Sequence, residues 1–179
     1  MTEPASRPPA SALTDALTAE LAKKTGVCWL RYGGTNHPVW HVWLDDAVYV
    51  VSGGEEQPLP GIRSVERVEV VMRSKETGQR LVTWVGSVST VTPDDERWEP
   101  VTTALVADRL NLDDLSTAAA KWAESSVVTE IRPTSELVEA PGRLSDDAHL
   151  APPKPTPAIT RGILPKVLHR RKKRRPKLS

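Results

Sequence analysis

The stretch PVWHVWL, residues 38–44, is apolar on both faces when it is read as a β-strand. Successive side chains of a strand point to opposite sides of the sheet. Large side chains would therefore lie on both sides, with Trp40, Val42 and Leu44 on one face and Val39, His41 and Trp43 on the other. A strand buried on both faces belongs inside a barrel, or beneath a covering helix or subunit.

Five more segments around this stretch have the composition of strands: residues 27–32, 48–52, 67–73, 80–91 and 126–132. The alternation is clean in residues 67–73, where Val68, Val70 and Met72 are expected to face inward. Short glycine-containing turns follow residues 27–32 and residues 67–73. Short turns join antiparallel neighbours, so these segments do not predict a parallel sheet of strand–helix–strand units.

Three helices complete the expected order. Leu13, Leu17 and Leu21 recur at helical spacing within residues 11–24, and Gly26 follows as a terminator. A second helix is expected to begin at Pro93 after a capping Thr92, and a third after a capping Asn111. One helix, five strands, two helices and a final strand predict an α+β fold, an antiparallel β-barrel with flanking helices.

Charge divides the chain into two unlike parts. Residues 151–179 contain ten Lys or Arg and no Asp or Glu. Residues 1–150 hold the other 14 of the 24 basic residues and all 23 acidic ones, which gives them a net charge of −9. We expect a disordered N-terminus over residues 1–10, a folded domain over 11–140, and a Pro-rich linker with a disordered basic C-terminal tail over 141–179.

The sequence also indicates a compartment. Cys28 is the only cysteine, so no disulfide can form within the chain, and a reducing environment is expected. The first residues lack the basic and apolar regions of a signal peptide. No apolar run approaches the roughly 20 residues that span a bilayer. These features predict a cytoplasmic protein without a transmembrane segment.

Several segments together resemble the FMN-binding split-barrel superfamily, and within it the pyridoxamine 5′-phosphate oxidase-like proteins. They are HPVWHVWL (37–44), SGGEEQPLPG (52–61), RSKETGQRLVTW (73–84), RLN (109–111) and KWAESSVV (121–128). The likeness covers roughly residues 11–138. It implies a split barrel that forms a homodimer, with a flavin site at each subunit interface and redox chemistry at the flavin ring.

The resemblance further implies a flavin-class cofactor, FMN or a deazaflavin, and an oxidoreductase whose substrate the sequence does not identify. The cofactor would carry the reaction, so no catalytic residue is predicted. The loop that follows residues 48–52 contains Glu55 and Glu56, where a phosphate would need cations, so another flavin, haem or no cofactor are alternatives to FMN. The candidate cofactor-binding residues are Trp43, Ser52, Gly53, Gly54, Gln57, Arg63, Arg73, Lys75 and Trp84.

Three other side chains have simpler interpretations. His37 and His41 would lie roughly 13 Å apart along one strand face, too far apart to share a metal ion, and no metal site is predicted. His41 is interpreted as a hydrogen-bonded residue of the barrel or interface, with contact to a flavin or haem edge as the alternative. Cys28 lies among apolar residues with no cation beside it, so we expect a core position rather than a reactive thiolate.

The basic run near the C-terminus is predicted to bind polyanions. Its dense charges repel one another, cannot form a core, and attract phosphates through counterion release. Nonspecific nucleic acid is the first candidate, and an anionic lipid surface is the second. A tail that is merely solubilising, or that folds back on the acidic domain, is the simpler alternative. A second hypothesis for the whole protein is therefore a non-catalytic barrel that this tail tethers to nucleic acid or ribosomes. The residues of the run are Arg170, Arg171, Lys172, Lys173, Arg174 and Arg175.

Overall fold

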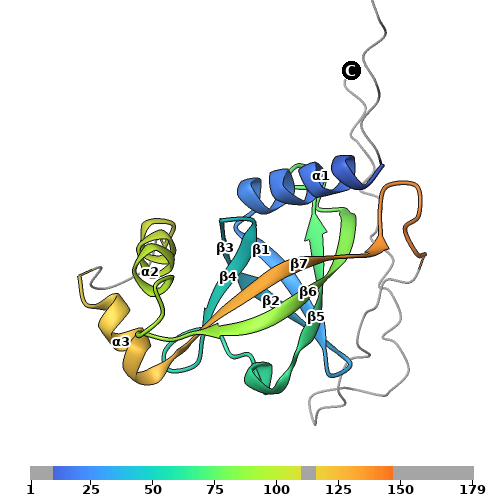
Figure 1. Ribbon diagram of the computed structural model, residues 1–179. Coiled ribbons are helices and arrows are strands. Elements are labelled where there is room, and N and C mark those ends of the chain that lie inside the picture. Colours follow the sequence, from blue (N-terminus) through green and yellow to red (C-terminus); the bar gives the residue numbers. More distant parts are fainter. Residues whose placement is uncertain (1–9, 110–115, 147–179) are drawn as a thin grey trace, which may run out of the picture. The chain divides into compact units, whose positions relative to one another are not determined.

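The computed structural model describes residues 10–109 and 116–146, with side chains from Asp15 onward. Three helices, one short 3-10 helix and seven strands follow one another in this part of the chain (Figure 1). They are α1 (Ala10–Lys24), β1 (Val27–Tyr32), β2 (Thr35–Trp40), β3 (Val42–Leu44), β4 (Ala47–Ser52), η1 (Ile62–Ser64), β5 (Arg67–Arg73), β6 (Arg80–Val91), α2 (Trp98–Ala107), α3 (Ala118–Ser125) and β7 (Val127–Glu139).

The seven strands form one antiparallel sheet in the order β2-β1-β5-β6-β7-β4-β3. The two edge strands, β2 and β3, are consecutive in the chain and only His41 separates them. The sheet must therefore curl until its edges meet, as a barrel does. The backbone N–H of His41 donates to the carbonyl of Gly26 at 3.2 Å, just before β1. The prediction of an antiparallel barrel with flanking helices is confirmed.

The stretch 38–44 is buried on both faces, as predicted, but it is not a single strand. His41 interrupts it, so that its first half ends β2 and its second half forms β3. Val39 belongs to the apolar core inside the curled sheet, and Trp43 packs against that core. Val42 belongs to a second core outside the sheet, where Trp40 and Leu44 also pack.

Strand β4 is buried along its whole length because it lies between these two cores. Val48 and Val50 point into the barrel, where they join Leu30 of β1 and Val70 of β5. The alternate residues of β4 face α2 and α3, which lie together on one side of the sheet (Figure 1). Helix α1 lies across one end of the barrel, where Leu21 is buried.

Two predicted boundaries are wrong. Residues 93–97 form turns rather than a first helical turn, and α2 begins at Trp98. The cause is Asp95, whose side chain accepts a hydrogen bond from the backbone N–H of Arg97 at 2.9 Å and whose own N–H donates to Thr92. The last strand, predicted to end at residue 132, continues to Glu139.

Strand β7 continues through Pro133 because the ladder is irregular at that point. Pro133 lies opposite Gly86, and the register between β6 and β7 shifts around Trp84 and Gly86. A proline lacks the N–H of a regular ladder and is tolerated at such irregularities. The predicted cap at Asn111, the N-terminal residues 1–9 and the basic tail lie outside the described residues. Within the described part, no helix is long and apolar enough to cross a membrane.

Candidate functional site

A cavity of about 880 Å³ opens on the described part of the chain. Its walls come from the face of α1, the turn between β3 and β4, and the strands β6 and β7. The chain segments that meet here are far apart in sequence, from Asp15 to Leu137. A cavity of this size, with apolar and polar walls, is typical of small-molecule and cofactor sites.

Two of the predicted residues, Trp43 and Trp84, both line this cavity. Trp84 is only 2% exposed and belongs to the barrel core, and Trp43 is half-buried against the same core. The indole N–H of Trp84 is buried and has no hydrogen-bond acceptor among the described residues. An unpaired buried donor costs free energy, and a ligand oxygen or nitrogen would relieve that cost.

Gly86 makes room for the Trp84 ring. A Cβ atom at Gly86 would lie 2.9 Å from Cζ3 of Trp84 and 2.4 Å from Cγ2 of Ile131. No side chain other than hydrogen fits at such distances without movement of a buried neighbour. The absence of a side chain at position 86 therefore allows the Trp84 ring to occupy its place in the cavity wall.

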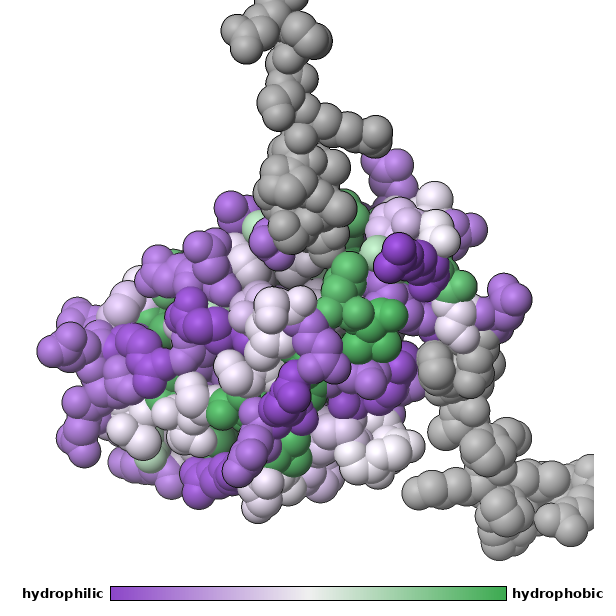
Figure 2. Space-filling view, turned by 45° about the vertical axis from the view of Figure 1, so that its right-hand side comes forward, coloured by the Kyte–Doolittle hydropathy of each residue, from purple (hydrophilic) through white to green (hydrophobic). Residues whose placement is uncertain are grey.

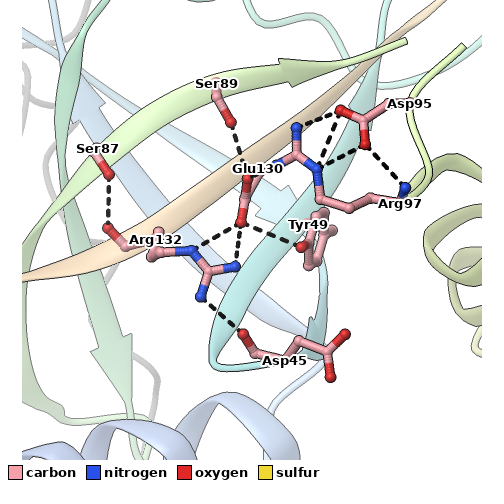
Figure 3. Close-up of polar contacts among 8 residues, drawn as sticks. All are labelled: Asp45, Tyr49, Ser87, Ser89, Asp95, Arg97, Glu130 and Arg132. Atoms are coloured by element: carbon pink, nitrogen blue, oxygen red, sulfur yellow. Dashed lines mark hydrogen bonds and ion pairs between the residues drawn. The ribbon is translucent and has the colours of Figure 1, made fainter.

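One cation, Arg132, lines the cavity, and a buried carboxylate holds it (Figure 3). Glu130 is 4% exposed and its Oε1 accepts from Arg132 Nε at 3.0 Å and from Arg132 Nη2. Nη1 of Arg132 donates to the carbonyl of Asp45 at 2.9 Å. Arg132 is thus fixed from both sides, by its own strand and by the turn before β4.

Glu130 is the centre of a larger network (Figure 3). Its Oε2 accepts from Ser89 Oγ at 2.9 Å and forms an ion pair with Arg97, while Tyr49 donates to Oε1 at 3.3 Å. Burial alone would raise the pKa of Glu130, but the hydrogen bonds from Arg132 and Ser89 and the charges of Arg132 and Arg97 lower it below its ordinary value. The carboxylate stays ionised and offsets the charge of Arg132.

The predicted loop residues do not line the cavity and serve the fold instead. Ser52 is 2% exposed at the end of β4. A Cβ at Gly54 would lie 2.9 Å from Ser125 Oγ, and the carbonyl of Gly53 accepts from Ser126 Oγ at 3.1 Å. The loop is therefore packed against the end of α3.

The side-chain N–H groups of Gln57 are both engaged within the protein. Its Nε2 donates to the carbonyls of Trp40 at 2.9 Å and Val51 at 3.2 Å. The acidic residue beside it, Glu56, accepts from the indole of Trp122 at 2.9 Å and forms an ion pair with Arg109. These contacts explain why acids and amides occur in the loop without a phosphate to bind.

The three predicted cations also lie outside the cavity lining. Arg63 is exposed in η1, and Lys75 is exposed in the turn between β5 and β6. Arg73, at the end of β5, places its guanidinium 4.3 Å from the centre of the Trp29 ring. The structure therefore brings Trp43 and Trp84 together and leaves the other predicted cofactor-binding residues elsewhere.

His41 and Cys28 have the structural positions that were expected of them. His41 is 2% exposed, and its Nε2 lies 3.2 Å from the carbonyl of Ala22. Burial lowers the pKa of His41 to about 4, against the opposing effects of the Ala22 hydrogen bond and Asp108. Cys28 is fully buried, and burial raises the pKa of its thiol. In the described residues, no three His, Cys, Asp or Glu side chains gather as a metal site.

Several cavity residues were missed from the sequence. Asp15 and Thr18 come from α1, Arg132 is the last residue of the predicted final strand, and Thr134 and Glu136 come from the β7 extension beyond it. The signal for the latter was the alternation that continues past Pro133, which a proline in a strand tends to obscure.

No protein-family model matches the sequence, and no curated protein matches it. Solved structures do match. HutZ, the heme storage protein from Vibrio cholerae, is 13% identical, with a TM-score of 0.51 over 68% of this chain and 91% of that one. A FAD-binding protein from Mesorhizobium loti is 17% identical, with a TM-score of 0.47 over 66% of this chain and 86% of that one. The flavocytochrome Anf3 from Azotobacter vinelandii is 14% identical, with a TM-score of 0.43 over 82% and 85%.

The likeness to HutZ concerns the fold alone, and it agrees with the sheet described above. A curled antiparallel sheet of seven strands, with β2 and β3 at its edges, is covered by three helices. The chain has the FMN-binding split-barrel fold of the pyridoxamine 5′-phosphate oxidase-like proteins.

Proposed function

We propose that the cavity between α1 and β7 binds the ring system of a flavin-class cofactor, and that the protein is an oxidoreductase of a substrate still to be identified. The observation that carries this proposal is the pair Trp43 and Trp84 in the wall of one cavity of about 880 Å³. Aromatic side chains favour planar aromatic ligands through stacked or edge-on contacts. The unpaired indole N–H of Trp84 suits the carbonyl and nitrogen acceptors of a flavin ring.

The residues of the cavity fit the ring but offer little to a phosphate. The packed loop Ser52–Gln57 and the cations Arg63, Arg73 and Lys75 do not line the cavity. Arg132 does, but Glu130 offsets its charge. The proposal therefore names the flavin class, with a deazaflavin included, and not FMN in particular.

In this proposal, the bound ring supplies the redox chemistry and the chain supplies its environment. Trp84 and Trp43 orient the ring and exclude water from one side of it. Gly86 leaves the space that the Trp84 ring occupies. Neither His nor Cys is among the described residues that line the cavity, so no side chain there is assigned a nucleophilic role.

We also propose that a second copy of the chain covers the cavity. Leu137, which lines it, is 40% exposed, and its neighbour Val138 is 41% exposed. On the face shown in Figure 2, hydrophobic side chains gather in a few patches on a mostly hydrophilic surface. Sedimentation of the full chain and of Leu137→Lys should give a dimer and a monomer, and a monomeric wild type would contradict the proposal.

The experiment for the cofactor is an absorption spectrum of the purified protein, followed by equilibrium dialysis against riboflavin, a deazaflavin and haem. Haem is included because HutZ is described as a heme storage protein and its ligand is also planar. Flavin or deazaflavin uptake near one equivalent per chain supports the proposal. Uptake of haem alone, or of none of the three, would contradict it.

A second candidate function rests on the charge segregation. Six consecutive basic residues, 170–175, follow a domain with an excess of acidic residues. We propose that this run binds nucleic-acid phosphates without sequence preference, since it has no aromatic residue on which a base could stack. Such binding is compatible with a cofactor in the barrel, and its test is given in the Discussion.

A further inference from the structure

We infer that the cavity selects an aromatic ring system that carries no phosphate, so that it binds riboflavin more tightly than FMN or FAD. This inference rests on the proposed function and specifies the ligand of the same site. It starts from the charges in the cavity wall, taken together with Trp84, a residue of this wall whose buried indole N–H has no partner among the described residues.

Two carboxylates in the lining are uncompensated. Asp15 on α1 and Asp46 in the turn between β3 and β4 are both exposed, and neither forms an ion pair with a described side chain. Asp46 has a φ of 58°, so its backbone is in the left-handed turn conformation that also fixes the position of its Cβ. Both carboxylates therefore contribute negative charge at the mouth of the cavity.

The remaining two charged residues of the lining are each neutralised by a partner. Glu136 forms an ion pair with Arg67. Arg132 forms one with Glu130, which is itself shared with Arg97, and Arg97 in turn is paired with Asp95. The lining and its partners thus leave a net of about two negative charges.

A phosphate is the wrong group for such a wall. It carries about −1.5 to −2 charge near neutral pH and presents three strong acceptor oxygens that need N–H or O–H donors. The hydroxyl of Thr134 already donates to the carbonyl of Val85 at 2.7 Å. Thr18 is only 5% exposed. Arg132 keeps its position by donating to Glu130 and to Asp45, and Ser135 adds one exposed hydroxyl to the lining, so few donors remain for an anion.

The isoalloxazine ring and ribityl chain meet no such penalty. The ring is uncharged, and its acceptors match the Trp84 donor, while the ribityl hydroxyls can donate to Asp15 and Asp46. Like charges repel within about a Debye length, which is near 8 Å at physiological salt. The cavity wall therefore disfavours a phosphate for two reasons: the carboxylates of Asp15 and Asp46 repel it, and the wall has few hydrogen-bond donors for its oxygens.

The experiment compares riboflavin, FMN and FAD by fluorescence titration of the full chain at pH 7 and 150 mM salt. We expect riboflavin to bind about tenfold more tightly than FMN. A chain with residues 170–175 changed to Gln is titrated in parallel, so that attraction of phosphate to the tail does not enter the comparison.

The double variant Asp15→Asn and Asp46→Asn should bring the affinity for FMN close to that for riboflavin. Asp94→Asn is the matched control, because Asp94 is equally exposed but does not line the cavity, and it should leave the ratio unchanged. FMN binding as tight as riboflavin in the wild type would overturn the inference and leave the flavin-class proposal standing. Binding of neither flavin would overturn the proposed function itself.

Discussion

The side-chain amide of Gln57 pairs with the backbone of Trp40 as a neighbouring strand would. Its Oε1 accepts the Trp40 N–H at 2.8 Å, and its Nε2 donates to the Trp40 carbonyl at 2.9 Å. Trp40 is the last residue of the edge strand β2, where no further strand lies in the described sheet. Gln57 thus supplies hydrogen-bond partners to the backbone N–H and carbonyl of Trp40 at the sheet edge, where the chain passes from one side of the split barrel to the other.

Removal of these hydrogen bonds should destabilise the fold. Gln57→Ala is expected to lower the free energy of unfolding by about 3 kcal/mol, from about 1 kcal/mol for each of the three hydrogen bonds lost, two with Trp40 and one with Val51. Gln57→Glu should cost at least as much, because a carboxylate cannot donate to the two carbonyls. Gln79→Glu, in an exposed turn, is the control and should be nearly neutral. Urea denaturation measures all three, and a neutral Gln57→Glu would show that the pairing is not important.

Gly86 provides a second test of the cavity wall. Gly86→Ala should lower the free energy of unfolding by about 1–3 kcal/mol, because its Cβ would overlap Ile131 and Trp84. It should also weaken ligand binding through displacement of Trp84. Gly26→Ala is the matched control, since its Cβ would meet only Trp40 at 4.0 Å. An unchanged unfolding midpoint for Gly86→Ala would contradict the close packing.

His41 should make stability depend on pH. Its pKa is about 4 in the fold, against about 6.5 in an unfolded chain. The unfolded state binds the proton more readily, so this contribution is fully present above pH 6.5 and is lost as the pH falls toward 4. The loss amounts to roughly 3 kcal/mol.

The measurement is the difference in unfolding free energy between wild type and His41→Gln, from pH 7.5 to pH 4. Carboxylates titrate in both proteins and cancel in this difference. We expect the advantage of the wild type to shrink as the pH is lowered. A difference that stays constant with pH would mean that His41 is not held neutral by burial.

Glu130 should contribute more to stability than an exposed carboxylate does. Glu130→Gln leaves two arginines without their shared anion, and we expect a loss of about 2 kcal/mol at pH 7. Since its pKa is lowered in the fold, the stability it contributes is present above its unfolded pKa and is lost as the pH falls through the folded value. Glu136→Gln, which breaks the exposed pair with Arg67, should cost about 0.5 kcal/mol or less. Equal effects of the two variants in urea denaturation would contradict the network.

The basic tail has a prediction of its own. Binding of the full chain to duplex DNA at low salt should weaken with a log–log salt slope of about −5 if all six residues of the run 170–175 contact phosphates. Changing these six to Gln should abolish the binding and leave the unfolding of the domain unchanged. Filter binding or anisotropy that shows the same affinity for both proteins would rule out the tail as the contact.

Local patterns predicted much of the fold. The alternation in β5 placed Val68, Val70 and Met72 in the core, where each is at most 1% exposed. The bounds of β6 were also predicted from its turn and its apolar content. Alternation of apolar and polar residues predicts which residues are buried, because successive side chains of a strand lie on opposite faces of the sheet.

Fewer residues of the candidate site than of the fold could be predicted from the sequence. Trp43 and Trp84 were singled out as aromatic residues on strands, but the curl of the sheet, which no local pattern records, brings them to one cavity. The loop Ser52–Gln57 was interpreted as a cofactor loop because its residues can donate hydrogen bonds. The side-chain donors of Gln57 serve the carbonyls of Trp40 and Val51 instead. Competition from such tertiary partners cannot be read from a short segment.

Flavin binding in the cavity between α1 and β7 is tested most directly by quenching of tryptophan fluorescence by riboflavin in the wild type, in Trp84→Phe and in Trp98→Phe. Trp98 packs against the outer core and does not line the cavity. We predict saturable quenching in the wild type and in Trp98→Phe, with an affinity at least about tenfold weaker in Trp84→Phe, which loses the indole donor and part of the ring contact. Equal affinity in all three proteins, or no saturable quenching in any of them, would contradict it.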